Sequence, residues 1–354
     1  MKYARRFIEL RVLLGATALC ASILTATAVD VSTASANGTY FNVPVAIATS
    51  DSHVWVVNHL GNSVTELNSS NGSLVRVINT KADGFSGPDG IGADRSSVWV
   101  TSGNGNSVTE LNSSNGSLVR VINTKADGFY GPGPITVSGS HVWILNTGNN
   151  SVTELNSNSG SLVRVINAKT DDFSDPTGFV VAGSRIWVAN ILGRSVGSVI
   201  EINASSGSLI RVIKAKADAF DGPGPIAVSD SHVWVGNVNY STYGNSDGHS
   251  VTELNSSNGS LVRVINTKAD GFYGPKGMAA GGLHLWITNY KGNSVTELNS
   301  SNGSLVRVIN TKADGFYGPG PITVSGSHVW ILNTGNNSVT ELNSNSSSLV
   351  RVIG

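Results

Sequence analysis

Two charged residues interrupt an otherwise uncharged series in this sequence, and they are the first candidates for chemistry. Seven prolines open repeated segments, and the residues after them are Val45, Asp89, Gly133, Thr177, Gly224, Lys276 and Gly320. A carboxylate and an ammonium group can hold a polar ligand or move protons, so Asp89 and Lys276 indicate a differentiated pocket. The alternative is that both are ordinary solvated charges.

Aromatic and histidine side chains on variable loops form the second group of candidates. The longest insertion between repeated segments lies within Asn237–Ser250. Tyrosine rings offer a stacking surface with a polar tip, and histidine can bind or move a proton near neutral pH. The candidates of this kind are Tyr240, Tyr243 and His249 in the insertion, and His59 and Tyr290 in other loops. A tolerated surface insertion is the alternative interpretation of the long loop.

Recurring histidines could suggest a metal site, but their spacing argues against one. Five histidines stand two residues before a tryptophan: His53, His141, His232, His284 and His328. They belong to separate repeats and cannot converge at the bond length of about 2 Å that zinc requires. The single cysteine excludes a Cys-based zinc site and a disulfide framework. We therefore expect these histidines to be packing or capping residues, with no metal and no cofactor.

One repeated unit supplies the elements that position all these residues. The seven tryptophans mark seven copies, at Trp55, Trp99, Trp143, Trp187, Trp234, Trp286 and Trp330. Within a copy the apolar residues alternate with a period of two, which predicts strands; in the third copy these fall at 135–138, 141–145, 151–156 and 162–166. Four antiparallel strands in each of seven copies predict an all-β, seven-bladed β-propeller.

The predicted propeller is one domain that fills residues 37–354. Its blades cover approximately 44–86, 88–130, 132–174, 176–221, 223–273, 275–317 and 319–353. The copies run in phase from first strand to fourth. We therefore expect the first and seventh blades to close the ring by side-chain packing, and each tryptophan to be buried between blades.

A Glu/Arg pair recurs at opposed positions of the third and fourth strands in every copy, for example Glu154 and Arg164. We expect cross-strand ion pairs worth roughly 0.2–1 kcal/mol each. These pairs are part of the repeated scaffold and cannot define a unique site.

The first 28 residues have the composition of an export signal. A basic start is followed by the uncharged, mostly apolar run Val12–Val29, and Ala26-Thr27-Ala28 is a small-residue cleavage site. We expect a signal peptide over 1–28, with 36 as an alternative end, and a secreted or cell-envelope protein without membrane association after cleavage. An uncleaved anchor is the alternative, because the run is near the minimum length for a membrane span.

The repeats resemble a known family of propellers. Trp55-Val-Val-Asn58 and Trp286-Ile-Thr-Asn289-Tyr290 are similar to the Tyr-Val-Thr-Asn motif of the YVTN-repeat β-propellers, and the following Asn-Ser-Val-Thr-Glu-Leu-Asn resembles their third strand. Tryptophan replaces the tyrosine throughout, and Ser102 replaces the asparagine in the second copy. NHL-repeat and virginiamycin B lyase propellers are related in architecture. The lyases are thought to use His and Glu groups with magnesium, but every Glu beyond the signal belongs to the ion pairs, so that activity is not carried over.

Charge and motifs narrow the function further. Charged residues make up 13% of the chain and the formal net charge is zero, which excludes the basic patch of a nucleic-acid binder. The sequence favours a secreted, monomeric, non-catalytic binding or scaffold module for glycans, cell-envelope polymers or an extracellular protein, because repeated surfaces suit repeated ligands. The alternative is a lyase or hydrolase with a site at the top mouth of the central channel, which requires Asp89, Lys276, His59 or His249 to converge. An inert product of recent duplication is the third hypothesis. The expected site lies on the face that carries the blade connectors and the loops between second and third strands, called the top face below.

Overall fold

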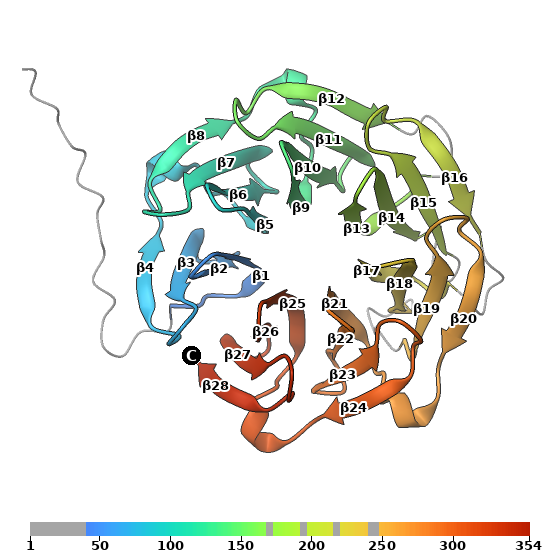
Figure 1. The fold of residues 1–354 in the computed structure, drawn as a ribbon. Coiled ribbons are helices and arrows are strands. Elements are labelled where there is room, and N and C mark those ends of the chain that lie inside the picture. Colours follow the sequence, from blue (N-terminus) through green and yellow to red (C-terminus); the bar gives the residue numbers. More distant parts are fainter. Residues whose placement is uncertain (1–39, 168–172, 192–196, 215–219, 240–247) are drawn as a thin grey trace, which may run out of the picture. The chain divides into compact units, whose positions relative to one another are not determined.

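The computed structural model describes residues 40–167, 173–191, 197–214, 220–239 and 248–354. In these residues, 28 strands form seven four-stranded sheets, and the sheets surround one axis as the blades of a ring (Figure 1). Consecutive strands pair antiparallel within each blade, which confirms the predicted all-β, seven-bladed propeller. No helix in the described ranges is long and apolar enough to cross a membrane. The predicted signal peptide lies outside them.

Each blade adds its strands from the axis outward. The innermost strands are β1 (Pro44–Ser50), β5 (Pro88–Ala93), β9 (Pro132–Ser138), β13 (Pro176–Ala182), β17 (Pro223–Ser229), β21 (Pro275–Gly281) and β25 (Pro319–Ser325). The second strands are β2 (His53–Asn58), β6 (Ser97–Ser102), β10 (His141–Asn146), β14 (Arg185–Ile191), β18 (His232–Asn237), β22 (His284–Asn289) and β26 (His328–Asn333).

The outer half of each blade has the same order. The third strands are β3 (Ser63–Asn68), β7 (Ser107–Asn112), β11 (Ser151–Asn156), β15 (Gly197–Asn203), β19 (Ser250–Asn255), β23 (Ser294–Asn299) and β27 (Ser338–Asn343). The outermost strands are β4 (Leu74–Ile78), β8 (Leu118–Ile122), β12 (Leu162–Asn167), β16 (Leu209–Ile213), β20 (Leu261–Ile265), β24 (Leu305–Ile309) and β28 (Leu349–Ile353). In the described residues, short 3-10 turns occur in four connectors, as η1 (Lys81–Asp83), η2 (Lys125–Asp127), η3 (Lys268–Asp270) and η4 (Lys312–Asp314).

The hydrophobic core lies in layers between neighbouring blades. All seven tryptophans are at most 2% exposed, as predicted. Trp286 on β22, for example, packs in one cluster with Val295 of its own blade and with Val329 and Ile331 of the next. Because a flat blade cannot bury its apolar faces alone, each blade depends on both of its neighbours.

A buried glutamate on each third strand joins the strands of one blade. In the first blade Glu66 is fully buried, with His53 Nδ1 at 2.7 Å from Oε1 and Arg76 Nε at 2.9 Å from Oε2. Histidine has this role in five blades, and Ser97 and Arg185 replace it in the other two. Burial raises the pKa of Glu66, while Arg76 and His53 oppose the rise. The predicted ion pairs therefore form, but with buried carboxylates, and the value for an exposed pair does not describe them.

In five of the seven blades of the described chain, the same arginine also links its blade to the next. Arg307 Nη1 donates to the carbonyl of Ser346 at 2.7 Å, and Arg351 Nη2 of the last blade donates to the carbonyl of Ser70 in the first at 3.0 Å. Glycine allows this approach: a Cβ at Gly72, where φ is +71°, would lie 2.8 Å from Arg351 Cδ. In the seventh blade Ser347 occupies the glycine position at φ 60°, and its hydroxyl donates to Glu297 of the sixth.

The first and seventh blades close the ring without exchanging a strand. The sheets β1–β4 and β25–β28 are separate, and residues 40–43 add no strand to the last blade. Phe41 packs instead in one core cluster with Trp330 and Val339. The Val43 N–H donates to Asn337 Oδ1 at 3.2 Å. This bond is equivalent to the one that the Gly318 N–H donates to Asn293 Oδ1 between the sixth and seventh blades. Closure by side-chain packing is thus confirmed, with hydrogen bonds in addition.

Replacing Trp330 with alanine tests the closing junction. The cavity left in this core should lower the free energy of unfolding by about 3–5 kcal/mol, measured by urea denaturation. Trp286→Ala at an internal junction is the control and should cost a similar amount. A cost below about 1 kcal/mol for Trp330→Ala alone would show that the closing junction adds little to stability.

Candidate functional site

The described candidates lie where strands begin and end on the top face. Asp89 and Lys276 are the second residues of β5 and β21, two of the innermost strands (Figure 1). The other three lie beside the second-to-third-strand loops: His59 follows β2, Tyr290 follows β22, and His249 precedes β19. Tyr240 and Tyr243 lie outside the described residues.

His59 and Asp89 are brought together across the first two blades. His59 Nδ1 lies 2.8 Å from Asp89 Oδ1 and 3.2 Å from the carbonyl oxygen of Pro88. Both partners are acceptors, so Nδ1 carries a proton and the neutral ring keeps Nε2 as its acceptor nitrogen. The pair can therefore take a hydrogen bond or a proton from a ligand through Nε2.

Desolvation changes the acidity of both charged residues near the axis. It raises the pKa of the Asp89 carboxyl group, and the adjacent His59 opposes the rise. The Lys276 side chain reaches solvent, but the strands around the axis exclude bulk water from its surroundings, and this desolvation lowers the pKa of its ammonium group. Among the described residues Lys276 has no ion pair. The structure thus pairs Asp89 with His59 and not with Lys276.

The blade connectors turn one side chain outward at a fixed position. In the sixth connector the Asp314 carboxylate accepts hydrogen bonds from the Thr311 N–H at 2.9 Å and from Thr311 Oγ1 at 2.5 Å, which caps η4. The chain that follows buries Phe316 and leaves Tyr317 59% exposed. The fifth connector is capped in the same way at η3 and exposes Tyr273.

Three tyrosines gather on the top face of blades five to seven. Tyr273, Tyr290 and Tyr317, which we call the tyrosine platform, line a hollow of about 360 Å³ together with Lys291 and Asn293. The platform combines exposed aromatic rings with an ammonium group and an amide, the usual composition of a site for a polar ligand with apolar faces.

The three rings of the platform have different roles. The His249 ring stacks on Tyr273 with 5.1 Å between centroids and 15° between planes, and Lys291 Nζ lies over the Tyr273 ring at 5.7 Å. The His249 ring is itself held by its Nδ1, 2.8 Å from the Phe272 carbonyl oxygen. Tyr273 is 40% exposed, as Tyr290 is, but its ring is in contact with His249 and Lys291. Among the described residues no such ring contact covers Tyr290 or Tyr317.

Glycines form the floor beneath the accessible rings. A Cβ at Gly335 would lie 2.4 Å from Tyr317 Cδ1, and one at Gly318 would lie 3.0 Å from Tyr290 Cε2. Tyr130 rests on Gly148 in the same way, with the same 2.4 Å approach. At the neighbouring loop, however, the second blade has a glycine where the sixth has Tyr290. Tyr130 is thus a solitary counterpart of Tyr317.

Tyr290 and His249 were predicted from the sequence as candidate site residues, whereas Tyr273 and Tyr317 were not. The reason is that both missed residues belong to the repeated connector Gly-Phe-Tyr-Gly-Pro and resemble scaffold. Variation at this position was the available signal, since the six connectors carry Ser86, Tyr130, Ser174, Asp221, Tyr273 and Tyr317.

Comparison with known proteins establishes the fold, but no family and no function. No family model and no curated protein matches the sequence. Hydrazine synthase of Kuenenia stuttgartiensis is similar in structure, with a TM-score of 0.70 over 89% of this chain and 99% of that chain at 16% identity. For virginiamycin B lyase from Staphylococcus aureus the TM-score is 0.64, over 84% and 94% at 18% identity. For the computationally designed Ika8 protein it is 0.58, over 82% and 94% at 11% identity. Identities this low establish the β-propeller fold alone.

The raised pKa of Asp89 predicts a specific pH dependence of stability. The folded chain favours the neutral acid relative to the unfolded chain, so this contribution is complete below the unfolded pKa of about 3.9 and is lost as the pH rises through the folded value. As the pH is raised from about 4 to 5.5, below the range where histidine titrates, the melting temperature of Asp89→Asn should therefore increase relative to that of the wild type. The exposed Asp51→Asn is the control. Parallel melting curves for wild type and Asp89→Asn would contradict this.

Proposed function

We propose that this protein is a secreted carbohydrate-binding module whose ligand lies on the tyrosine platform. The observation that carries the proposal is the pair of accessible rings, Tyr290 at 40% and Tyr317 at 59% exposure, beside one hollow. A sugar ring has an apolar C–H face and a polar rim. Aromatic faces bind the first, and the nearby amide and ammonium groups bind the second.

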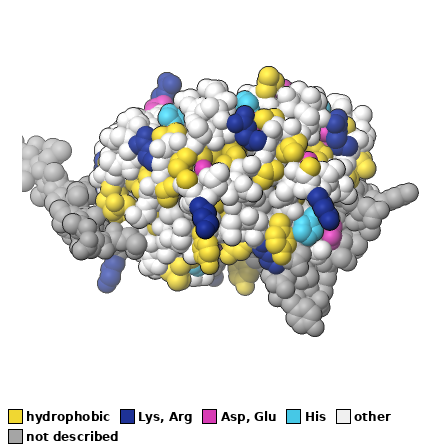
Figure 2. Space-filling model, turned by 90° about the horizontal axis from the view of Figure 1, so that it is seen from below, with side chains coloured by type: hydrophobic (Ala, Val, Ile, Leu, Met, Phe, Trp, Pro, Cys, Tyr) yellow, Lys and Arg dark blue, Asp and Glu magenta, His cyan; other side chains and the backbone are white. Residues whose placement is uncertain are grey.

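The ligand class that fits is a glycan or a carbohydrate-bearing envelope polymer. Asn293 and Lys291 supply polar groups at the same hollow as the rings. Figure 2 shows the basic side chains of one side of the molecule scattered as separate groups among uncharged atoms, without a continuous basic patch. Such a surface suits a neutral polymer better than nucleic acid, which needs continuous positive charge.

The proposal includes export by the N-terminal signal peptide, action as a monomer and a repeat of the YVTN type. The asparagine of the Trp-x-x-Asn segments supports the last assignment. In the first blade the Asn58 amide donates to the hydroxyls of Ser63 and Thr65 at 3.1 and 2.9 Å, and the same bonds recur at Asn146, Asn237, Asn289 and Asn333. In the described residues Asn190 makes neither bond. The asparagine therefore has the same structural role in five of the seven blades.

One observation supports a second candidate function. His59, oriented by Asp89, presents Nε2 as the base that a lyase or hydrolase of the propeller type would need. This pair lies on blades one and two, whereas the tyrosine platform lies on blades five to seven. His59→Gln should then abolish turnover without affecting glycan binding at the platform.

The platform is tested by a matched pair of tyrosine variants. After a glycan array and cell-wall fractions have identified a ligand for the mature protein, Tyr317→Ala should weaken its affinity about tenfold, as expected when one stacked ring worth about 1–1.5 kcal/mol is lost. Affinity is measured by isothermal titration calorimetry. Tyr130→Ala is the control, because it removes an equally exposed ring from a near-identical connector, and it should leave affinity unchanged.

Two results would contradict the proposal. One is that wild-type protein binds no glycan or envelope fraction. The other is that both alanine variants reduce affinity equally, which would place the ligand outside the platform.

A further inference from the structure

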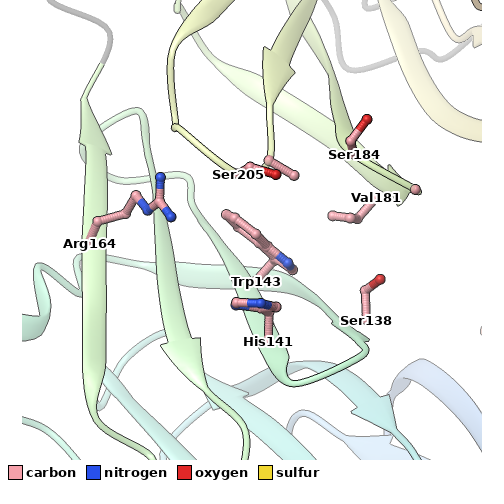
Figure 3. A pocket seen from close by; sticks show the side chains of 9 residues that line it. Ser138, His141, Trp143, Arg164, Val181, Ser184 and Ser205 are labelled. Atoms are coloured by element: carbon pink, nitrogen blue, oxygen red, sulfur yellow. The ribbon is translucent and has the colours of Figure 1, made fainter.

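A pocket of about 430 Å³ lies between the third and fourth blades, on the face opposite the tyrosine platform. It opens where β9 turns into β10, beside the turns β13–β14 and β15–β16 (Figure 3). Its lining consists of Ser138, His141, Trp143 and Arg164 from blade three and Val181, Gly183, Ser184, Ala204 and Ser205 from blade four. In Figure 3 the Trp143 ring, Ser138, Ser184 and Ser205 surround a common space, with His141 beneath the tryptophan.

The indole nitrogen of Trp143 has no acceptor among the described residues. Trp55 and Trp234 each donate through Nε1 to a serine hydroxyl at 2.9 Å. Ser138 holds the corresponding position beside Trp143, yet within the described residues no such bond forms. Trp99, Trp286 and Trp330 also lack an acceptor within the described residues, but their Nε1 atoms are sealed from solvent, whereas Trp143 lines the pocket. A donor that is buried in this way binds an acceptor from a ligand or from water.

Two more groups in the pocket lack the partners that their counterparts have. Arg164 pairs with Glu154 through Nε at 2.6 Å. In the described chain neither Arg164 nor Arg76 makes the bond to the next blade that the other five arginines make, as Arg351 does to Ser70. The hydroxyl of Ser205 also makes no internal bond, whereas that of Ser257 donates to an asparagine at 2.6 Å. Arginine, indole and serine donors therefore face one space.

Blade four, and not blade three, creates the space. The third and seventh copies are nearly identical in sequence, so the junctions that follow them differ only through the next blade. Blade four has Ala204 and Gly183 where the first blade has Ser69 and Asp51. These smaller side chains leave room beside Trp143, while the equivalent Trp330 is 0% exposed.

We propose that this inter-blade pocket binds a small, uncharged ligand rich in hydrogen-bond acceptors, of the size of one sugar residue. The charge of Arg164 is compensated by the buried Glu154, to which His141 Nδ1 also lies at 2.6 Å, so the pocket has no free charge for an ionic ligand. Its volume falls within the range of small-molecule sites, about 300–1,000 Å³. An amide carbonyl fits the donors best, since it can accept from both the indole and the guanidinium.

The test follows the indole N–H resonances of the seven tryptophans, using N-acetylglucosamine as the probe. In ¹⁵N-labelled protein the Trp143 resonance, assigned by its loss in Trp143→Phe, should shift and saturate on titration, while that of Trp330 should stay unchanged. Glucose, which is uncharged and lacks the acetamido carbonyl, should bind about fivefold more weakly, as expected for one lost hydrogen bond. A Trp143 resonance that does not move, or equal shifts of all seven, would overturn the proposal.

Filling the pocket provides the second arm. Ala204→Leu should abolish the Trp143 shift, and Ser69→Leu at the equivalent place in the first blade should preserve it. Ser184→Leu at the exposed rim serves the same purpose if Ala204→Leu does not fold. A shift that persists when the pocket is filled would overturn the proposal. Tyr317→Ala should leave the Trp143 shift intact. The experiment therefore tests this pocket independently of the tyrosine platform.

Discussion

A carboxylate buried inside each blade is the constraint on which this ring depends. An unpaired buried charge is strongly destabilising, so every third-strand glutamate requires two partners in fixed positions. His53 and Arg76 meet this need for Glu66 from the second and fourth strands. The arginine of the last blade also donates a hydrogen bond to the next blade, from Arg351 to the Ser70 carbonyl. One side chain therefore holds both the strand pairing within its blade and the spacing between two blades. The tryptophan layers supply most of the apolar burial, but the glutamates fix the register in which those layers meet.

The repeated sequence made the fold predictable, because each local pattern occurs seven times. Alternating apolar residues gave the strands, and the unbroken phase of the copies gave the mode of closure. The glutamate pairs were predicted as cross-strand ion pairs, but the burial of their carboxylates was not predicted, because register identifies the partner on the adjacent strand and not the blade that covers it. The site depended on distances between blades. No sequence pattern brings His59 to Asp89, or Tyr317 to Tyr290, and Tyr317 resembled scaffold until its exposure was known.

Near-identical blades carry distinct surfaces because a few substitutions change what each junction exposes. Tyr130 and Tyr317 occupy the same connector position on the same glycine floor, but only Tyr317 has a tyrosine beside it. Trp143 and Trp330 likewise begin from the same sequence, and the small Ala204 beside Trp143 separates them. The third and seventh copies therefore serve as an internal comparison, in which differences in chemistry arise from the neighbouring blade alone.

Because the ring closes in phase, the junction between its first and last blades does not differ in kind from the internal junctions. Each blade takes its four strands from one continuous stretch of chain, and the junction between β1 and β25 uses the same kinds of contact as the internal junctions. Cutting any connector and rejoining the natural ends would preserve every strand pairing, so the fold is indifferent to circular permutation. The blade, which is the unit of strand pairing, is also the unit of sequence repetition. An unequal crossover within the gene would add or remove a whole blade and would leave no half-built sheet behind.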